Sequence, residues 1–182
     1  MRKAILYIAM SLDGYIADAR GGVDWLTGDG SEPEHEGSYP AFYNAVDTVI
    51  MGHTTYRQIT CELSPGHWVY GNKKCYVITH QSLPSAEEAV FAASDPAALL
   101  TRLKGGAGRD IWICGGASVA GQLMKSGLID EYCISVIPTL LGSGTPLFGG
   151  SDVMQRLQLC EVRRYNGIVD LVYRPVGVRG ED

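Results

Sequence analysis

The segment Asp110–Met124 constrains the fold more than any other part of this 182-residue sequence, because two glycines join a strand-like run directly to a helix-like run. The apolar residues before Gly115 predict a buried strand, and a helical pattern follows Gly116. Glycines allow the backbone to come close to a ligand, and the first turn of a helix presents unpaired N–H groups with a positive dipole. The segment predicts either an anion-binding site or a tight turn without a ligand.

Two more apolar runs, at 47–51 and 74–78, end in similar junctions. The residues that follow them are glycine or polar: Gly52, His53, Thr54 and Thr55 after the first run, and Thr79 and His80 after the second. In an open α/β sheet, ligands bind beyond the carboxyl ends of the strands. Three such strand ends predict one elongated, phosphate-bearing ligand that lies across them.

Three segments resemble the nicotinamide-cofactor segments of the dihydrofolate reductase fold, in the same order and at similar separations: Met51–Tyr56, Val77–Gln81 and Ile113–Val119. Three more are similar to the riboflavin-biosynthesis reductase branch, the family of the bacterial RibD C-terminal domain: Met10–Ala17, Val23–Leu26 and Leu140–Phe148. The resemblance covers residues 3 to about 174. Because six motifs occur in the right order, it is fairly specific.

This resemblance implies an α/β fold of the dihydrofolate reductase type, with three layers α/β/α, a mostly parallel mixed sheet and a C-terminal antiparallel hairpin. The pattern of the residues agrees, since strand-like and helix-like runs alternate before a β-rich end. Asn166-Gly167 between two strand-like runs indicates a hairpin, and Asp95-Pro96 indicates a helix start. Aromatic residues at helical spacing predict another helix over 39–46. We expect one domain at 1–176 and a flexible tail at 177–182.

Composition excludes several classes of partner. Charged residues make up 19% of the chain and the formal net charge is −5, so no basic surplus exists to neutralise a nucleic-acid backbone. The apolar runs are too short to span a bilayer, and residues 1–3 lead into a strand-like run without a cleavage pattern. We therefore expect a cytoplasmic protein with no nucleic-acid or membrane partner. The five cysteines lack zinc-ligand spacing and the deaminase signature is missing, so we expect no metal and no deaminase chemistry.

The resemblance implies an NADPH-dependent reductase, similar to 5-amino-6-(5-phosphoribosylamino)uracil reductase, that transfers a hydride to a pyrimidine- or pterin-like molecule. The implied cofactor-binding residues are Gly52, His53, Thr54, Thr55, Thr79, His80, Gly115, Gly116, Ala117, Ser118 and Val119. We expect NADPH because the segment at Thr79 contains no carboxylate to accept both ribose hydroxyls. NADH stays the alternative, since His53 stands where dihydrofolate reductases carry an arginine.

The substrate side departs from both families that the chain resembles. Dihydrofolate reductases hold a carboxylate on the helix after the long loop, and residues 39–46 contain none. We take Asp24 as the candidate catalytic acid, with a solvated loop carboxylate as the alternative. Asp13 and Trp25 are candidate substrate contacts, or else a turn residue and a loop anchor. Cys114, the third candidate contact, stands where riboflavin-type reductases usually have a glutamate, and a thiol does not replace a carboxylate acceptor.

The long acidic loop at 21–38 is typical of functional segments, so we predict a lid over the pocket, with Glu36 as a further acid near it. The apolar run at 129–141 predicts a homodimer surface or, alternatively, an interior strand. Two alternatives to a riboflavin-type reductase stay open. One is a non-catalytic nucleotide-binding dimer of the same fold, and the other is a dihydrofolate reductase.

Overall fold

A computed structural model describes residues 1–81, 83–84, 86–149 and 154–177. Its centre is an eight-stranded sheet in the order β5-β4-β3-β6-β1-β7-β10-β9. Its strands are β1 (Ala4–Ser11), β3 (Val46–Gly52), β4 (Lys74–Ile78), β5 (Val90–Ala92), β6 (Asp110–Gly115), β7 (Glu131–Ile137), β9 (Leu157–Tyr165) and β10 (Ile168–Pro175). A separate pair is formed by β2 (Tyr15–Ala17) and β8 (Thr145–Pro146). The helices are α1 (Tyr39–Ala45), α2 (His53–Gln58), its π-helical continuation η1 (Ile59–Leu63), α3 (Pro96–Lys104) and α4 (Ala117–Lys125).

The six strands from β5 to β7 pair in parallel. Only the hairpin of β9 and β10 breaks this pattern, because β10 is antiparallel both to β7 and to β9. The prediction of a mostly parallel mixed sheet with a C-terminal antiparallel hairpin is therefore confirmed. The sheet carries the carboxyl ends of its parallel strands along one edge, which is where such sheets bind ligands.

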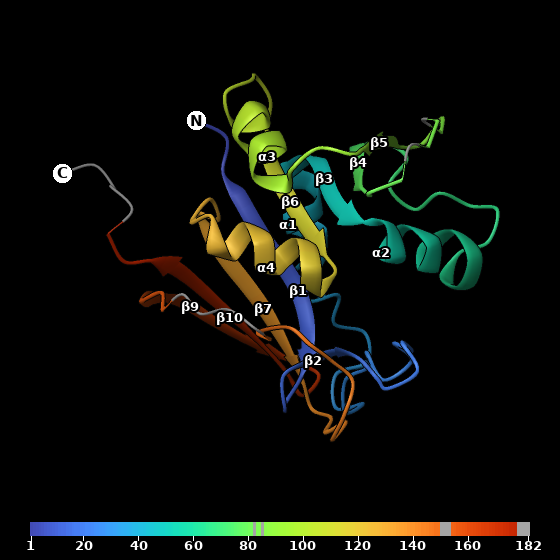
Figure 1. Cartoon of the computed structure of the whole chain (residues 1–182). Coiled ribbons are helices and arrows are strands. Elements are labelled where there is room, and N and C mark those ends of the chain that lie inside the picture. The colour runs from blue at the N-terminus through green and yellow to red at the C-terminus, as the bar shows by residue number, and fades with distance from the viewer. Residues whose placement is uncertain (82, 85, 150–153, 178–182) are drawn as a thin grey trace.

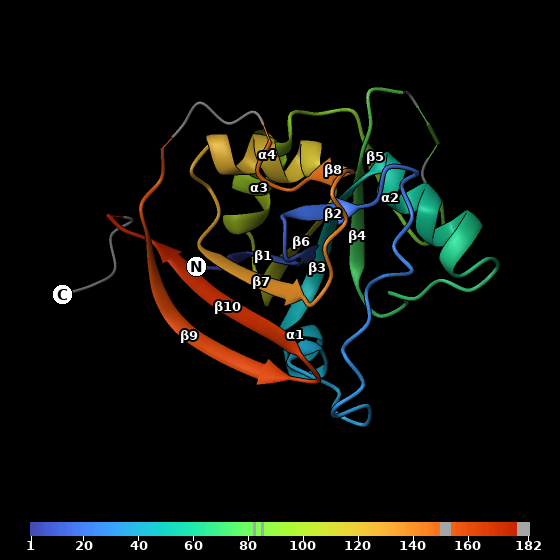
Figure 2. The same cartoon turned by 90° about the horizontal axis from the view of Figure 1, so that it is seen from below.

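Helices cover both faces of the sheet, as Figures 1 and 2 show: α3 and α4 lie on one face and α1 lies on the other. Side chains alternate between the two faces along each strand. Leu6 and Ile113 pack with Val119 of α4 in one core cluster. Tyr7 and Trp112, one residue away in each strand, belong to the cluster on the α1 face. This second cluster is rich in aromatic rings.

Several local predictions are confirmed. Asp95 caps α3, because its carboxylate accepts hydrogen bonds from the N–H groups of Ala97 (2.6 Å) and Ala98 (3.1 Å). The turn between β9 and β10 is Asn166-Gly167, with positive φ angles of 45° and 73° as this turn requires. The sequence pattern did not indicate the short strands β2, β5 and β8, whose two or three residues give too little periodicity to detect.

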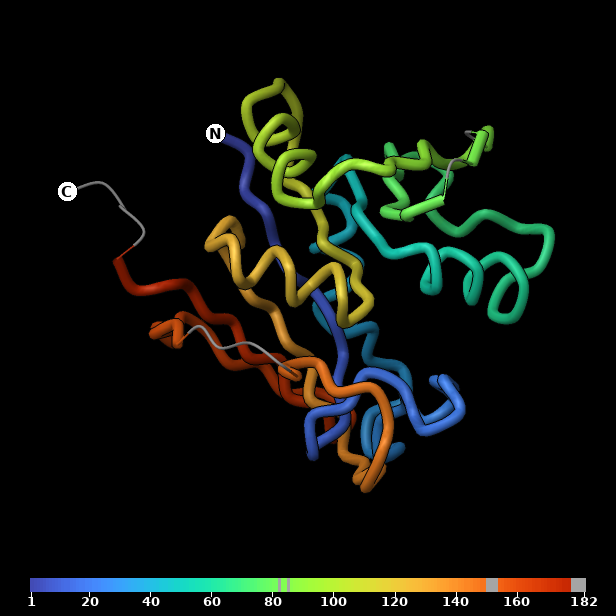
Figure 3. The backbone as a smooth tube through the Cα atoms, viewed as in Figure 1, coloured from blue at the N-terminus to red at the C-terminus, as the bar shows by residue number. Residues whose placement is uncertain are grey.

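The long loop predicted as a lid lies at the carboxyl edge of the sheet, beside the connection between β7 and β8 (Figure 3). The turn of the β9-β10 hairpin contacts the middle of this loop, at residues 29–35. Asn166 O accepts a hydrogen bond from Asp29 N–H (3.0 Å), and Asn166 N–H donates to Glu32 Oε2 (3.0 Å). The ring of His35 stacks on that of Tyr165, with 5.1 Å between centroids. The loop is therefore docked on the hairpin in this structure.

The apolar run at 129–141 is mainly an interior strand. Its central part, β7, pairs with β1 on one side and β10 on the other, so it offers no free edge to a partner. Leu140, after the strand, is 71% exposed. No described helix is long and apolar enough to span a membrane. The predicted tail at 177–182 lies outside the described residues from position 178 onward.

Candidate functional site

The three polar junctions meet at the carboxyl edge of the sheet. Met51 of β3 pairs with Gly115 of β6, and Gly52 pairs with Ile78, the last residue of β4. Thr79 directly follows Ile78. The strand ends at Gly52, at Thr79 and at Gly115 are thus neighbours across β4, β3 and β6. One ligand can lie across all three junctions only if their strand ends are neighbours, and the structure meets this condition.

Glycines add no side chains of their own to the space between the ends of β3 and β6. A Cβ on Gly52 would lie 3.4 Å from Val119 Cγ2 and 3.7 Å from the Gly116 nitrogen. A Cβ on Gly116 would lie 3.3 Å from Thr55 Oγ1. The Gly115–Gly116 peptide bond is cis. The two junctions therefore form a cradle of main-chain atoms, bordered by Thr55 Oγ1 and Val119 Cγ2, that an added side chain would crowd.

Helix α4 begins in this cradle. Gly116 is its N-cap, and no side chain caps it. The N–H groups of Ala117, Ser118 and Val119 have no acceptor within an α-helix, and the helix dipole adds positive potential at this end. Such an end favours a phosphate. The donor set therefore fits a diphosphate.

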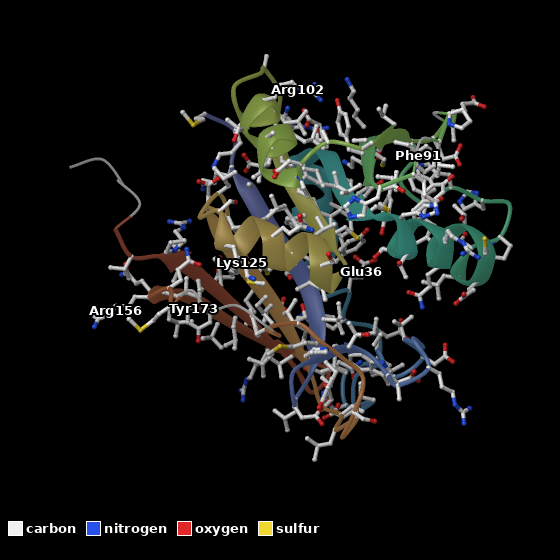
Figure 4. The ribbon with its side chains drawn as sticks, in the orientation of Figure 1. Glu36, Phe91, Arg102, Lys125, Arg156 and Tyr173 are labelled. Carbon is white, nitrogen blue, oxygen red and sulfur yellow. The ribbon has the colours of Figure 1, made fainter. Side chains whose placement is uncertain are left out.

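On the side toward β5, aromatic side chains border the three junctions. The ring of His53 lies 6.4 Å from that of Tyr56 and 6.1 Å from that of Phe91, between centroids; Phe91, labelled in Figure 4, is the middle residue of β5. Thr79 is buried, and its Oγ1 accepts a hydrogen bond from Gln81 N–H (3.1 Å), whereas His80 and Thr54 are exposed. These rings and hydroxyls suit an adenosine.

The same end holds an acid that the sequence pattern did not indicate. Tyr56 OH donates a hydrogen bond to Glu88 Oε1 (2.6 Å), and this bond holds the pKa of the Glu88 carboxyl below its usual range. Burial, followed by the bond to Glu88, raises the pKa of Tyr56 to about 12. Glu88 belongs to the connection before β5 and not to the segment at Thr79, where the sequence shows no carboxylate for the ribose.

The predicted substrate residues of the loops are separated. Asp13 accepts hydrogen bonds from the Ser11 hydroxyl (2.6 Å) and from the N–H groups of Leu141 (3.1 Å) and Gly142 (2.7 Å), so it joins two loops. The Ser11 bond has the largest effect and lowers the pKa of Asp13; burial opposes it, and the Gly142 and Leu141 bonds lower the pKa further. Trp25 is half-buried and its Nε1 donates to Gly22 O (3.1 Å). Asp24 and Glu36 are exposed.

Cys114 lies on the aromatic face, one residue before the glycine pair. Burial raises the pKa of its thiol to about 11. Its hydrogen-bonding partner is the hydroxyl of Tyr70, 3.8 Å from Sγ. The ring of Tyr70 in turn packs edge-on against Trp112, with 5.2 Å between centroids. Cys114 is thus the one predicted substrate residue that adjoins the cradle directly.

The structure adds a buried carboxylate that the sequence pattern did not indicate. Asp170 of β10 is fully buried and accepts hydrogen bonds from the hydroxyls of Ser135 (2.6 Å), Tyr165 (3.1 Å) and Ser38. Ser38 is the N-cap of α1, and its hydroxyl also lies 3.0 Å from that of Tyr7. Helix α1 carries no acid, as its sequence shows, but Asp170 contacts Ser38 at the start of that helix from the sheet.

A retrospective signal for Asp170 exists in the sequence. It shares a side of β10 with buried Val172, two residues away, so an acid occupies a core-facing position of the strand. No comparable signal marks Tyr70, which lies in an irregular segment between η1 and β4.

Comparison with known proteins decides the family. The profile of the RibD C-terminal domain matches residues 2–170. The chain belongs to the RibD C-terminal domain family. It is 42% identical to the uncharacterized protein YwjB of Bacillus subtilis (strain 168) over 173 residues, which are 94% of this chain and 97% of the relative.

Solved structures of RibD-like proteins are also similar. A Shewanella sp. PV-4 protein named for riboflavin biosynthesis has a TM-score of 0.83 and 26% identity, covering 95% of this chain and 98% of the other. The Thermotoga maritima diaminohydroxyphosphoribosylaminopyrimidine deaminase/5-amino-6-(5-phosphoribosylamino)uracil reductase has a TM-score of 0.72 and 19% identity, over 96% of this chain and 56% of that one. Dihydrofolate reductase of Enterococcus faecalis, solved with NADP(H), has a TM-score of 0.62 and 16% identity, over 96% of each chain. The predicted dihydrofolate reductase-like fold is confirmed.

Proposed function

We propose that this RibD C-terminal domain chain is an NADPH-dependent reductase that transfers a hydride to a pyrimidine- or pterin-like small molecule. The observation that carries the proposal is the meeting of Gly52, Thr79 and Gly115-Gly116 at one sheet edge, where α4 begins. The family supports an oxidoreductase, since one similar structure is named a reductase and another was solved with NADP(H). The activity closest to the proposal is that of 5-amino-6-(5-phosphoribosylamino)uracil reductase.

The residues of the cradle would bind and orient the cofactor. In this proposal the N–H groups of Ala117, Ser118 and Val119 hold the diphosphate at the start of α4, and Thr55 Oγ1 borders it. Thr79 and His80 lie toward the ribose, and His53 and Thr54 toward the adenosine side. The bound cofactor supplies the hydride, and the protein contributes position and polarity.

Binding and turnover test the proposal separately. We expect NADPH to quench tryptophan fluorescence with saturation below the millimolar range, and absorbance at 340 nm to fall when 5-amino-6-(5-phosphoribosylamino)uracil or a related heterocycle is added. A flat titration up to millimolar NADPH would remove the proposal. Saturable binding without oxidation across a panel of pyrimidines and pterins would instead favour the non-catalytic module. Tight methotrexate binding with dihydrofolate turnover would favour a dihydrofolate reductase.

We also propose that the chain forms a homodimer. Apolar side chains on the edge strand β9 support this, since Leu157, Leu159 and Val162 are 38%, 49% and 54% exposed. Gel filtration at two concentrations far apart should show a dimer whose elution moves toward the monomer on dilution. A monomer at both concentrations would contradict the assembly without touching the proposed reaction.

A further inference from the structure

A cavity of about 470 Å³ lies at the amino edge of the sheet, away from the carboxyl edge that carries the cradle. It is lined by the start of β3, by β4 and a residue before it, and by the end of α3 with the turn that follows. Figure 1 shows this end of α3 at the top of the view, beside the N-terminus of the chain. Thr48, which lines the cavity, precedes Gly52 in β3 by roughly 13 Å along the strand. The cavity is therefore separate from the cradle, and the proposed reaction does not use it.

Two cations of the lining have no recorded acidic partner. Lys74 and Arg102 are both exposed, and neither forms an ion pair within the part of the chain that the structure describes. The third cation, Arg2, is paired with Asp47, the acidic residue of the lining. Because Arg2 and Asp47 compensate each other's charge, Lys74 and Arg102 give the cavity an excess of positive charge. The cavity is thus basic in a chain whose formal net charge is −5.

Neutral side chains of the same lining add hydrogen-bond donors. The hydroxyl of Tyr43 donates to Asn72 Oδ1 (2.8 Å), which leaves the NH₂ group of the Asn72 amide to donate to another partner. Tyr76 is 7% exposed, and its hydroxyl has no hydrogen bond recorded with a described residue. Among the described residues, Trp68 Nε1 is the fully buried side-chain nitrogen or oxygen without a partner, so the Tyr76 hydroxyl is still accessible. The lining therefore offers an amide and a hydroxyl beside its cations.

Arg2 fixes the wall of the cavity at the end of α3. Its Nε donates to Arg109 O (2.5 Å) and its NH1 group donates to Leu103 O (3.3 Å), so it joins both sides of the turn at residues 105–108. The carbonyl groups at the end of a helix carry partial negative charge, which would oppose an anion. Here the Arg2 guanidinium engages one of them. The wall is therefore held in place before a ligand arrives, which lowers the cost of ordering it on binding.

We propose that this cavity binds a phosphate dianion, either inorganic phosphate or the phosphate group of a small ester. The two charges of a dianion match the two cations that have no recorded acidic partner. The guanidinium of Arg102 can donate to two phosphate oxygens, and Lys74 adds a point charge. The remaining phosphate oxygens can accept from Asn72 and Tyr76. Water screens the exposed cations, so we expect a dissociation constant of about 1 mM.

Titration calorimetry of inorganic phosphate and of glycerol 3-phosphate tests the site, with sodium chloride added to hold the ionic strength constant. Saturating NADPH would occupy the start of α4, the other place where phosphate could bind. Lys74→Gln and Arg102→Gln should each weaken phosphate binding about tenfold, and the double variant should show none. Lys125→Gln is the matched control, because it removes the same charge from an exposed residue of α4 outside the cavity. Figure 4 labels Arg102 and Lys125 on their two helices.

The two ligands distinguish the sources of the phosphate group. Tighter binding of glycerol 3-phosphate would identify a phosphorylated small molecule as the ligand. Equal or tighter binding of inorganic phosphate would identify the free anion. The inference holds in both cases, because each depends on the same two cations.

The inference is overturned if the wild type binds neither ligand at concentrations on the order of 10 mM. It is also overturned if a folded double variant binds phosphate as tightly as the wild type, or if Lys125→Gln loses as much affinity as Lys74→Gln. Circular dichroism and NADPH affinity should be the same in all variants. Absence of NADPH binding would remove the proposed function, whereas the loss of phosphate affinity on substitution, measured without cofactor, would still decide the inference.

Discussion

Substituting Gly52 by alanine places one methyl group in the cradle and changes little else. Gly52 has φ −80° and ψ 158°, which alanine adopts freely, and the new Cβ would meet Val119 Cγ2 at an ordinary 3.4 Å. The fold should therefore tolerate Gly52→Ala, with a gain of up to about 1 kcal/mol from the stiffer unfolded chain. The same methyl lies 3.7 Å from the Gly116 nitrogen, on the route by which a diphosphate would approach it. Overfilling a fitted site costs about 1–3 kcal/mol, which corresponds to roughly 5- to 150-fold in NADPH affinity.

The assay compares NADPH titrations and thermal unfolding of the wild type, Gly52→Ala and Gly121→Ala. Gly121 lies inside α4 with open space around it, so its alanine variant should gain about 0.5–1 kcal/mol of stability and bind NADPH normally. Equal NADPH affinity in folded Gly52→Ala and wild-type protein would refute the placement of the diphosphate between β3 and β6.

Further predictions concern the buried carboxylate, pH and the ribose. Asp170→Ala strands three hydroxyls and should lower stability by about 1–3 kcal/mol in urea unfolding; an unchanged midpoint would contradict this. Asp13 has a lowered pKa in the folded state, so its contribution is present above about pH 4 and is lost as pH falls. The melting-temperature difference between wild type and Asp13→Asn should therefore shrink from pH 7 to pH 3. NADPH should bind at least tenfold more tightly than NADH; the reverse order would point to Glu88 as a ribose acceptor.

The parts of the site that are made of backbone could be predicted from the sequence. A strand that ends in glycine before a helix is a local pattern, and Gly52 and Gly115-Gly116 each lie within one such pattern. That the carboxyl ends of their strands lie along one edge follows from the parallel sheet that alternating strands and helices predict, whereas the adjacency of β3 and β6 is known only from the structure. Asp24, by contrast, is predicted only from its position in a loop, and it is exposed in the structure.

The parts made of side chains could not be predicted in this way. Ser38 and Asp170 are 132 positions apart, and Tyr70 and Cys114 are 44 apart, so no local periodicity links them. Each pair forms only because distant elements pack on the same face of the sheet. A sequence without aligned relatives shows which residues can carry such chemistry, but it does not show which of them meet.

The contrast between a cofactor site made of backbone and a substrate site made of side chains, both proposed here for this chain, has a consequence for how such a protein changes its substrate. The proposed cofactor site depends on main-chain N–H groups and on the absence of Cβ atoms, so a side chain added there, as at Gly52, should obstruct it. The substrate half depends on the polar atoms of single side chains over an aromatic core that holds its own shape. At position 114 a thiol and a carboxylate differ mainly in donating or accepting a hydrogen bond. Under the proposed function, a substitution at position 114 should therefore change substrate binding and leave NADPH affinity unaltered.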